Sequence, residues 1–154
     1  MARPEKNRNV FAPPIFKHFK PSGIRKNQLK NLLMSLDEYE ALRLADHLGL
    51  EHNQAAEKMS ISRPTFTRLI SKARNKMAIF LMEGRSLQIE GGAVHFSQNN
   101  IKCLDCGNIY SDELNREMYI CPDCGSDKNE DIARAFGHGR CCRKKWNNNN
   151  KENE

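Results

Sequence analysis

Residues 59–74 read MSISRPTFTRLISKAR, and this stretch decides the fold because it joins the end of one predicted helix to the start of the next. Before it, small and apolar residues at helical spacing predict a short helix over about residues 52–59. After it, an apolar stripe with the period of an α-helix covers about residues 63–83 and stops at Gly84. The sequence therefore predicts two helices separated by a short turn.

The second of these helices starts with polar groups. Ser62 is a favourable N-cap, and Pro64 is tolerated in the first turn because its missing N–H has no partner there. Hydroxyl and basic side chains on the outer face are of the types that contact phosphates and base edges in a DNA major groove. These candidate DNA-binding residues are Ser62, Arg63, Thr65, Thr67, Arg68, Ser71 and Lys72. Positive charge near a helix N-terminus opposes the helix dipole, so an external anion explains Arg63 and Arg68 better than helix stability does.

Packing residues around the turn follow the pattern of a helix-turn-helix. The small or apolar residues at the required positions are Ala56, Met59, Ile61, Phe66 and Leu69. A glycine is usual in the turn, and Ser60 stands in its place, which we expect to cost a modest amount of free energy. The alternative interpretation is a three-helix bundle with a solvated basic face.

A further helix and a basic arm are predicted upstream. In SLDEYEALRLADHLGL, Ser35 precedes Glu38 by three residues, which is the spacing of a capping box, and Gly49 ends the helical pattern. Residues 1–30 contain eight Lys or Arg residues, one Glu and four prolines, so they predict an extended basic arm. Such charge favours a polyanion such as nucleic acid as the partner, although charge runs are also typical of plain solvated surfaces.

The predicted fold class is mainly α. Alternating apolar residues on both sides of Gly91 and Gly92 predict a small β-hairpin in LQIEGGAVHF. The expected organisation is a basic arm at residues 1–30 and a three-helix helix-turn-helix domain with this hairpin at residues 31–97. A zinc-ribbon module is expected at residues 98–126, and a basic, Cys- and His-containing disordered tail at residues 127–154.

Five segments of the chain together resemble a known family. MARPEKNRNV, FKPSGI, LDEYEALRLADHLGL, AAEKMSISRPTFTRLISKARNKMA and LQIEGG resemble, in the same order, the uncharacterised protein family 0251, also called domain of unknown function 134. The resemblance covers about residues 1–96. It implies a bacterial or archaeal cytoplasmic protein, predicted to bind DNA through a helix-turn-helix similar to region 4 of sigma factors. It implies no established target, activity or ligand.

Four cysteines form a second motif. Cys103, Cys106, Cys121 and Cys124 follow the pattern Cys-x2-Cys-x14-Cys-x2-Cys, which is close to the spacing of a zinc ribbon. Four thiolates leave no open coordination position, so the metal is expected to be structural and the module to need it for folding. Zinc is the expected ion, and iron in a rubredoxin-like site is the alternative.

The tail offers further soft ligands in His138, Cys141 and Cys142. A second metal or redox site there would make the protein a metal- or redox-responsive regulator. The alternative is a basic tail with incidental thiols.

The leading interpretation is a sequence-specific DNA-binding transcriptional regulator. The helix beginning near Arg63 reads the major groove of double-stranded DNA, the arm grips the backbone or the minor groove, and a homodimer contacts two half-sites. The alternative is an adaptor that docks on RNA polymerase or another transcription protein without reading DNA. No enzyme is expected, because the chain has no phosphate loop and no nucleophile motif. The apolar runs are too short to span a bilayer, and the N-terminus lacks the apolar segment of a signal peptide, so a cytoplasmic protein without a membrane partner is expected.

Overall fold

The computed structural model describes residues 6–138, which form two compact units. The first unit contains residues 6–10 and 16–93, and the second contains residues 11–15 and 94–138. Each has fully buried apolar side chains, such as Phe66 in the first unit and Phe96 in the second. Within the described ranges, no helix combines the length and the apolar character needed to cross a membrane.

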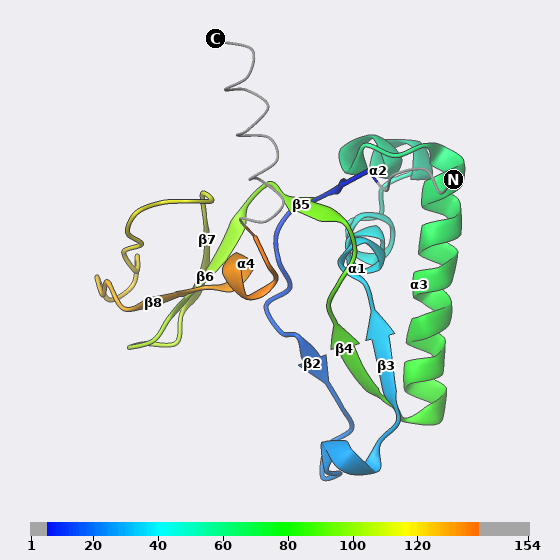
Figure 1. Cartoon of the computed structure of the whole chain (residues 1–154), viewed down its shortest axis with the longest axis horizontal. Helices are drawn as coiled ribbons and strands as arrows, with labels where there is room; N and C mark the ends of the chain where they lie inside the picture. The colour runs from blue at the N-terminus through cyan, green and yellow to red at the C-terminus, as the bar shows by residue number, and fades with distance from the viewer. Residues whose placement is uncertain (1–5, 139–154) are drawn as a thin grey trace. The chain divides into compact units, whose positions relative to one another are not determined.

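Helices make up most of the first unit (Figure 1). Helix α1 spans Leu36–Leu42 and continues as a π-helical turn, η2, over Arg43–His47. Helix α2 spans His52–Met59, and helix α3 spans Arg63–Glu83. The last of these ends at Gly84, whose φ of 62° is one that glycine adopts without a steric penalty. The three helices predicted from the sequence are therefore confirmed.

The core of this unit lies where the helices meet. Both α1 and α2 pack against α3. The buried residues of this cluster are Ala41, Leu44, Ala55, Ala56, Met59, Phe66, Leu69 and Ile70. Because burial of one large apolar side chain stabilises a fold by roughly 1.5–3 kcal/mol, this cluster is what fixes α3 in place.

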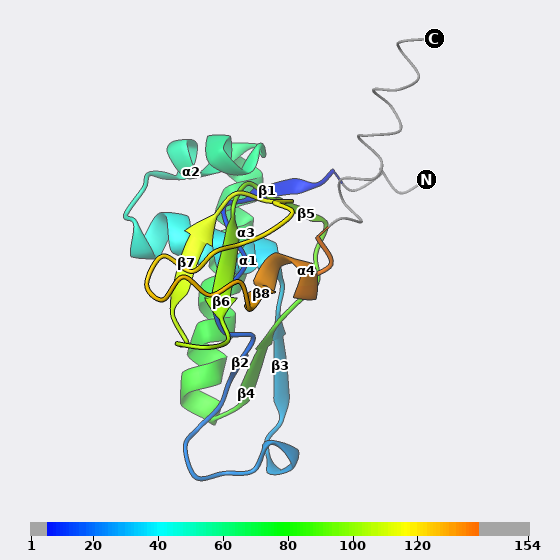
Figure 2. The same cartoon turned by 90° about the vertical axis from the view of Figure 1, so that its left-hand side faces the viewer.

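A three-stranded sheet completes the first unit. Its strands lie in the order β2 (His18–Phe19), β4 (Ser86–Ile89) and β3 (Asn31–Met34), and they run beside α3 (Figures 1 and 2). The β2–β4 pair is antiparallel and the β3–β4 pair is parallel. A short 3-10 helix, η1, spans Lys26–Gln28, and strand β1 spans Arg8–Val10.

The prediction of a mainly α fold with a small hairpin is wrong. Residues 6–138 contain eight strands as well as four α-helices, so the fold mixes α and β structure. Strand β4 pairs with β2 and β3 rather than with β5 (Val94–Phe96), which belongs to the second unit. Gly91, with φ of 81°, turns the chain after β4, and its carbonyl accepts a hydrogen bond from the Leu36 N–H at 3.0 Å. A parallel pair joins segments far apart in the sequence, so local alternation does not reveal it.

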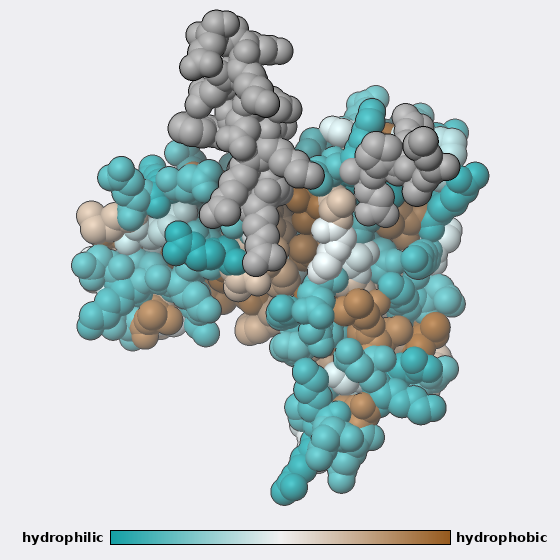
Figure 3. Space-filling view, viewed as in Figure 1, coloured by the Kyte–Doolittle hydropathy of each residue, from teal (hydrophilic) through white to brown (hydrophobic). Residues whose placement is uncertain are grey.

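An apolar hollow of ≈ 560 Å³ lies where α1, α3 and this sheet meet. Brown hydrophobic atoms are visible over the region of α3, β3 and β4 in Figure 3. The lining residues are Phe19, Met34, Tyr39, Leu42, Arg43, Asp46, His47, Met77, Phe80, Leu87 and Ile89. Burial raises the pKa of Tyr39, whose side chain lines this hollow.

The second unit is built around an antiparallel sheet. Strand β6 (Asn99–Cys103) lies between β7 (Ile109–Asp112) and β8 (Asn129–Asp131), and helix α4 (Ile132–Ala135) follows directly. Asn99 is fully buried and ties these elements together: its Nδ2 donates to Asp131 at 2.7 Å, and its Oδ1 accepts from the Ala133 N–H at 3.0 Å. This sheet holds the first cysteine pair at the end of β6.

Candidate nucleic-acid interface and metal centre

The turn between α2 and α3 is held by backbone hydrogen bonds and by the core beneath it. The Ile61 N–H donates to the Ala56 carbonyl at 3.0 Å, and Met59 and Phe66 on either side are fully buried. Ser60 adopts a left-handed conformation with φ of 56°. This is the conformation that makes glycine usual in such turns.

We expect Ser60→Gly to stabilise the first unit by roughly 1 kcal/mol when made in an Asn9→Ala background, because glycine has no Cβ to clash in the left-handed region. The background is needed because Asn9 Nδ2 donates to Ser60 Oγ at 2.8 Å, and glycine would also lose that hydrogen bond. Urea unfolding followed by helical circular dichroism measures the change. Ser60→Ala in the same background keeps the Cβ and should show no gain; equal gains from both substitutions would contradict the explanation.

The start of α3 is capped as predicted. Ser62 Oγ accepts a hydrogen bond from the Thr65 N–H at 3.4 Å and lies 2.8 Å from Thr65 Oγ1. Pro64 occupies the first turn, where no N–H is required. The helix therefore begins at a defined residue, which fixes where its first two turns present their side chains.

Among the other candidate residues on α3, one side chain is hydrogen-bonded to another of the described residues and three are not. Thr67 Oγ1 lies 3.0 Å from Nδ1 of His52, whose ring packs edge-on against Phe66. In contrast, Arg63, Arg68 and Ser71 are exposed, and their side chains form no hydrogen bond or ion pair within residues 6–138. Thr67 is thus engaged within the unit, whereas Arg63, Arg68 and Ser71 are available to a partner.

A polar cleft of ≈ 790 Å³ opens beside the N-terminal half of α3. Four basic side chains line it, two from α3 and two from the N-terminal segment. The lining residues are Lys6, Arg8, Ser35, Asp37, Glu38, Ser60, Ile61, Ser62, Thr65, Arg68, Leu69, Lys72, Gly92 and Ala93. Four of the seven candidate DNA-binding residues therefore share this cleft, while Arg63, Thr67 and Ser71 lie outside it.

Two carboxylates at the start of α1 reach the same cleft. Arg8 forms an ion pair with Asp37, whose side chain is 12% exposed. Lys72 Nζ lies 3.6 Å from Glu38 Oε1, and Lys76 Nζ lies 2.7 Å from Glu38 Oε2. Two of the basic residues lining the cleft, Arg8 and Lys72, are thus held by carboxylates of their own unit.

Sequence reasoning did not place Arg8, Asp37 or Glu38 at this site. The charge excess of the arm was the only signal for Arg8, and Glu38 was recognised only as part of a capping box. The contacts join residues 29 positions apart for Arg8 and Asp37, and 38 positions apart for Glu38 and Lys76. Such pairings depend on how the elements pack, and one sequence alone does not show them.

Arg74 lies on another face of α3 and is fully engaged. Its Nε and Nη2 donate to the Asp46 carboxylate at 3.0 and 2.6 Å. These hydrogen bonds hold the pKa of Asp46 below its usual range. Both side chains are about half exposed, so the pair stabilises the fold by less than about 1 kcal/mol. Arg74 is therefore an arginine on the same helix that lies outside the cleft.

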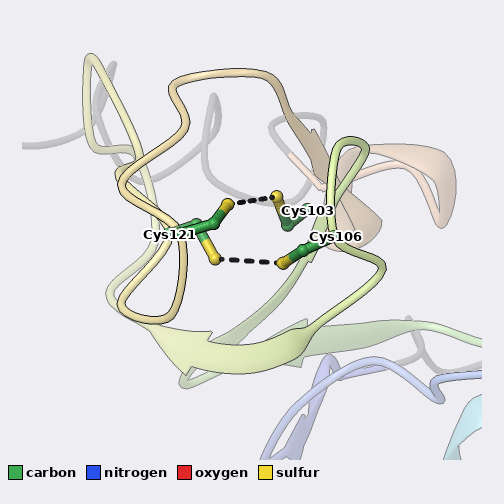
Figure 4. Close-up of side chains that lie close together, drawn as sticks. Cys103, Cys106 and Cys121 are labelled. Carbon is green, nitrogen blue, oxygen red and sulfur yellow. Dashed lines mark hydrogen bonds between the residues drawn. The ribbon is translucent and has the colours of Figure 1, made fainter.

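The four predicted metal ligands lie together in the second unit. The sulfur atoms of Cys103, Cys106, Cys121 and Cys124 all lie within 4.8 Å of one another. Figure 4 shows the side chains of Cys103, Cys106 and Cys121 directed toward a common point. The prediction that these residues form one cluster is confirmed, and the cluster can hold a metal ion.

The two cysteine pairs share the same local geometry. The Gly107 N–H donates to the Cys103 carbonyl at 3.0 Å, and the Gly125 N–H donates to the Cys121 carbonyl at 2.9 Å. Both glycines have positive φ, 78° and 73°, which a side chain would disfavour. Each glycine therefore lets the chain turn back sharply after a cysteine pair.

The sulfur distances fit metal ligation and exclude disulfides. Sγ of Cys103 lies 3.6 Å from Sγ of Cys124, and Sγ of Cys106 lies 3.6 Å from Sγ of Cys121. A disulfide requires about 2.05 Å. A tetrahedral ion with metal–sulfur bonds of about 2.3 Å places its sulfur atoms about 3.8 Å apart. The cluster thus has nearly the size that a four-thiolate site requires.

The acid–base properties of the thiols also favour a cation. A hydrogen bond from the backbone N–H of Cys124 lowers the pKa of Cys121 to about 7. The N–H of Ser126 acts in the same direction on Cys124, but the neighbouring sulfurs of Cys103 and Cys106 outweigh it and raise the pKa of Cys124 to about 12. Four thiolates at this spacing repel one another, so a bound cation is what allows all of them to ionise.

The predicted second ligand group is only partly within the described residues. His138 Nε2 lies 3.1 Å from Asn115 Oδ1, and burial lowers the pKa of His138. Its ring centroid lies 6.2 Å from that of His95. Cys141 and Cys142 lie outside the described residues, as does the end of the expected tail.

Comparisons with known proteins agree on one family. The family described as "Protein of unknown function DUF134" matches residues 1–97. A UPF0251 protein of Chloroherpeton thalassium is 47% identical over 143 residues, covering 91% of this chain and 95% of the relative. A UPF0251 protein of Halothermothrix orenii is 40% identical over 135 residues, covering 85% of this chain and all of the relative.

A further UPF0251 protein, from Pelotomaculum thermopropionicum, is 44% identical over 126 residues, covering 82% of this chain and 95% of the relative. No solved structure matches the chain. The relatives extend past residue 97, so the likeness includes cysteine-containing sequence as well as the helical unit. The chain therefore belongs to the DUF134 (UPF0251) family, whose function is unknown.

Proposed function

We propose that this protein binds double-stranded DNA as a transcriptional regulator, with α3 entering the major groove. The observation that carries the proposal is the exposure of Arg68 on the N-terminal half of α3. Arg68 lines the polar cleft and has no ion-pair partner within residues 6–138. An arginine in this position can donate two hydrogen bonds to the edge of a guanine. The N-cap at Ser62 fixes where the helix begins and the buried core fixes which face is exposed, which supports base recognition.

The four cysteines are proposed to hold one structural zinc ion. Cys103, Cys106, Cys121 and Cys124 would hold the ion and leave it no open coordination position, so zinc would crosslink two turns of the chain and carry out no reaction. Iron would bind the same four ligands, and metal analysis of the purified protein distinguishes the two ions by mass. The sulfur separations of 3.6 Å support a tetrahedral ion of either kind.

A homodimer on DNA completes the proposal. Helix-turn-helix proteins commonly bind two half-sites about one helical turn apart, which one copy of α3 cannot do. Protection of two half-sites in a footprint of a selected genomic fragment would support the dimer. Protection of a single short segment would support a monomer.

Arg68→Ala is expected to weaken binding to a selected genomic fragment by roughly 1–3 kcal/mol and to change binding to random DNA little. The reason is that a base contact contributes only at the right sequence. Fluorescence anisotropy titrations with both DNAs measure the two losses. Arg74→Ala removes the same charge from another face of α3, where Arg74 pairs with Asp46, and serves as the matched control.

Two results would contradict this assignment. Equal losses on both DNAs would make Arg68 a phosphate contact rather than a base contact. Binding that is no tighter on any genomic fragment than on random sequence would instead favour an adaptor that docks on the transcription machinery.

A further inference from the structure

We infer that the cleft between the N-terminal segment and α3 binds the sugar-phosphate backbone of DNA, with Lys6 and Arg8 as phosphate contacts. This inference rests on the proposed function, since it adds a second contact surface to the same complex. It assigns a role to residues before the helix-turn-helix, and it separates backbone contacts from base contacts.

Three contacts fix the N-terminal segment beside the helix-turn-helix. Asn9 Nδ2 donates to Ser60 Oγ at 2.8 Å, at the turn that precedes α3. The Arg8 N–H donates to the Ala93 carbonyl at 2.9 Å, and the Arg8 guanidinium pairs with Asp37. Lys6 and Arg8 are thereby brought to the side of a helix that begins more than fifty positions later in the chain. The basic residues of the polar cleft therefore come from two segments that the fold brings together, and not from one continuous basic stretch of sequence.

The charges of the cleft favour a polyanion. Four cations line it against two carboxylates, so an excess of positive charge remains. The side chains of Lys6 and Arg68 form no ion pair or hydrogen bond within the described chain. An arriving phosphate can pair with Lys6 without breaking an existing ion pair, whereas Arg8 keeps its pair with Asp37 and offers its remaining guanidinium N–H groups to the phosphate.

Glu38 allows one more cation to reach the DNA without leaving a buried charge uncompensated. Its side chain is 2% exposed, and two lysines share it: Lys76 at 2.7 Å and Lys72 at 3.6 Å. Lys72 is the more exposed of the two, at 68% against 21%. If Lys72 turns to a phosphate, Lys76 still neutralises Glu38, so the exchange avoids the large penalty of an isolated buried carboxylate.

The hydroxyl groups at the start of α3 lie on the same cleft. Ser62 and Thr65 line it together with the cations. Hydroxyl groups are among the donors that contact phosphates, and a contact to a phosphate carries no sequence information. A backbone strand lying in the cleft would therefore meet cations on both sides while the neighbouring base edges face Arg68.

The salt dependence of DNA binding tests this inference. The logarithm of the association constant falls as the logarithm of the salt concentration rises, and each lost phosphate contact should make this slope less steep by about 0.9. This change corresponds to roughly fivefold weaker binding at about 0.15 M salt. We expect Lys6→Ala and Arg8→Ala each to show this change, equally on a selected fragment and on random DNA. Anisotropy titrations of the full chain over a range of KCl concentrations supply the slopes.

Two further variants serve as controls. Lys6→Arg keeps the charge and should retain the wild-type slope. Lys26→Ala removes an exposed lysine from η1, at the end of the unit far from α2 (Figure 1), and should leave the slope unchanged. Because Lys6 is exposed, Lys6→Ala is expected to fold normally, which circular dichroism verifies.

The outcomes separate this inference from the proposed function. If the wild-type protein bound no DNA at all, the proposed function itself would be contradicted. Wild-type binding with an unchanged slope for Lys6→Ala and Arg8→Ala would overturn the cleft assignment alone. Calorimetric binding of inorganic tripolyphosphate that Lys6→Ala abolishes, with unchanged DNA slopes, would also overturn it, because the cleft would then be a site for a small anion.

Discussion

Cys121→Ser is expected to unfold the second unit while the first unit keeps its structure. The cysteine cluster links β6 to the segment that precedes β8, and residues 104–128 contain only the short strand β7, so little else orders that segment. Structural metal binding to such a small module supplies much of its folding free energy. Limited proteolysis and amide NMR of the full chain should show loss of order for the second unit alone, at residues 11–15 and 94–138, together with loss of the proposed metal.

Removal of the proposed metal from the wild-type protein should have the same effect. A strong chelator at neutral pH should unfold the second unit, and added zinc should restore it. The metal should also be released as the pH falls, because protons compete for thiolate ligands. Cys142→Ser keeps all four clustered thiols and is the control. A second unit that stays ordered without metal would contradict a structural role for the cluster.

Glu38→Ala is expected to destabilise the first unit by about 3 kcal/mol. Glu38 Oε2 accepts hydrogen bonds from the Ser35 N–H at 3.1 Å and from Lys76 Nζ at 2.7 Å, so alanine leaves a helix cap and a largely buried ammonium group without a partner. Loss of one partner from a buried ion pair typically costs 3–5 kcal/mol, and we expect the lower end because Lys76 retains some exposure. Urea unfolding followed by helical circular dichroism measures the loss.

Two further variants separate the cap from the charge. Glu38→Gln keeps an oxygen for the Ser35 N–H and should lose less than Glu38→Ala. The double variant Glu38→Leu with Lys76→Met removes both charges and should regain part of the stability. A loss of well under 1 kcal/mol for Glu38→Ala would show that the pair contributes little.

Local features of the sequence predicted the helices and the cysteine cluster well. Caps at Ser35 and Ser62 and the stops at Gly49 and Gly84 act within one turn of chain, so they can be recognised in a single sequence. The spacing within each cysteine pair is equally local, and a metal ion shared by both pairs would require them to meet, as they do in the structure.

Contacts between distant segments could not be predicted in the same way. The β3–β4 pair joins Asn31 to Ser86, and nothing in either short segment identifies its partner. Glycines after β4 predicted a hairpin because a hairpin is the commonest local solution, whereas the chain instead continues into the second unit. The place of Arg8 and Asp37 on the cleft depends on the same long-range packing.

The parallel pairing of β3 and β4 also constrains the order of folding. All three helices of the first unit lie between these two strands in the sequence, so the strands can meet only after a long segment of chain has become compact. Closing such a loop from an extended chain carries an entropic cost that helix formation reduces by shortening the path. We therefore expect the helix-turn-helix to assemble before the sheet does, and during synthesis β4 can close the unit only after α3 has left the ribosome.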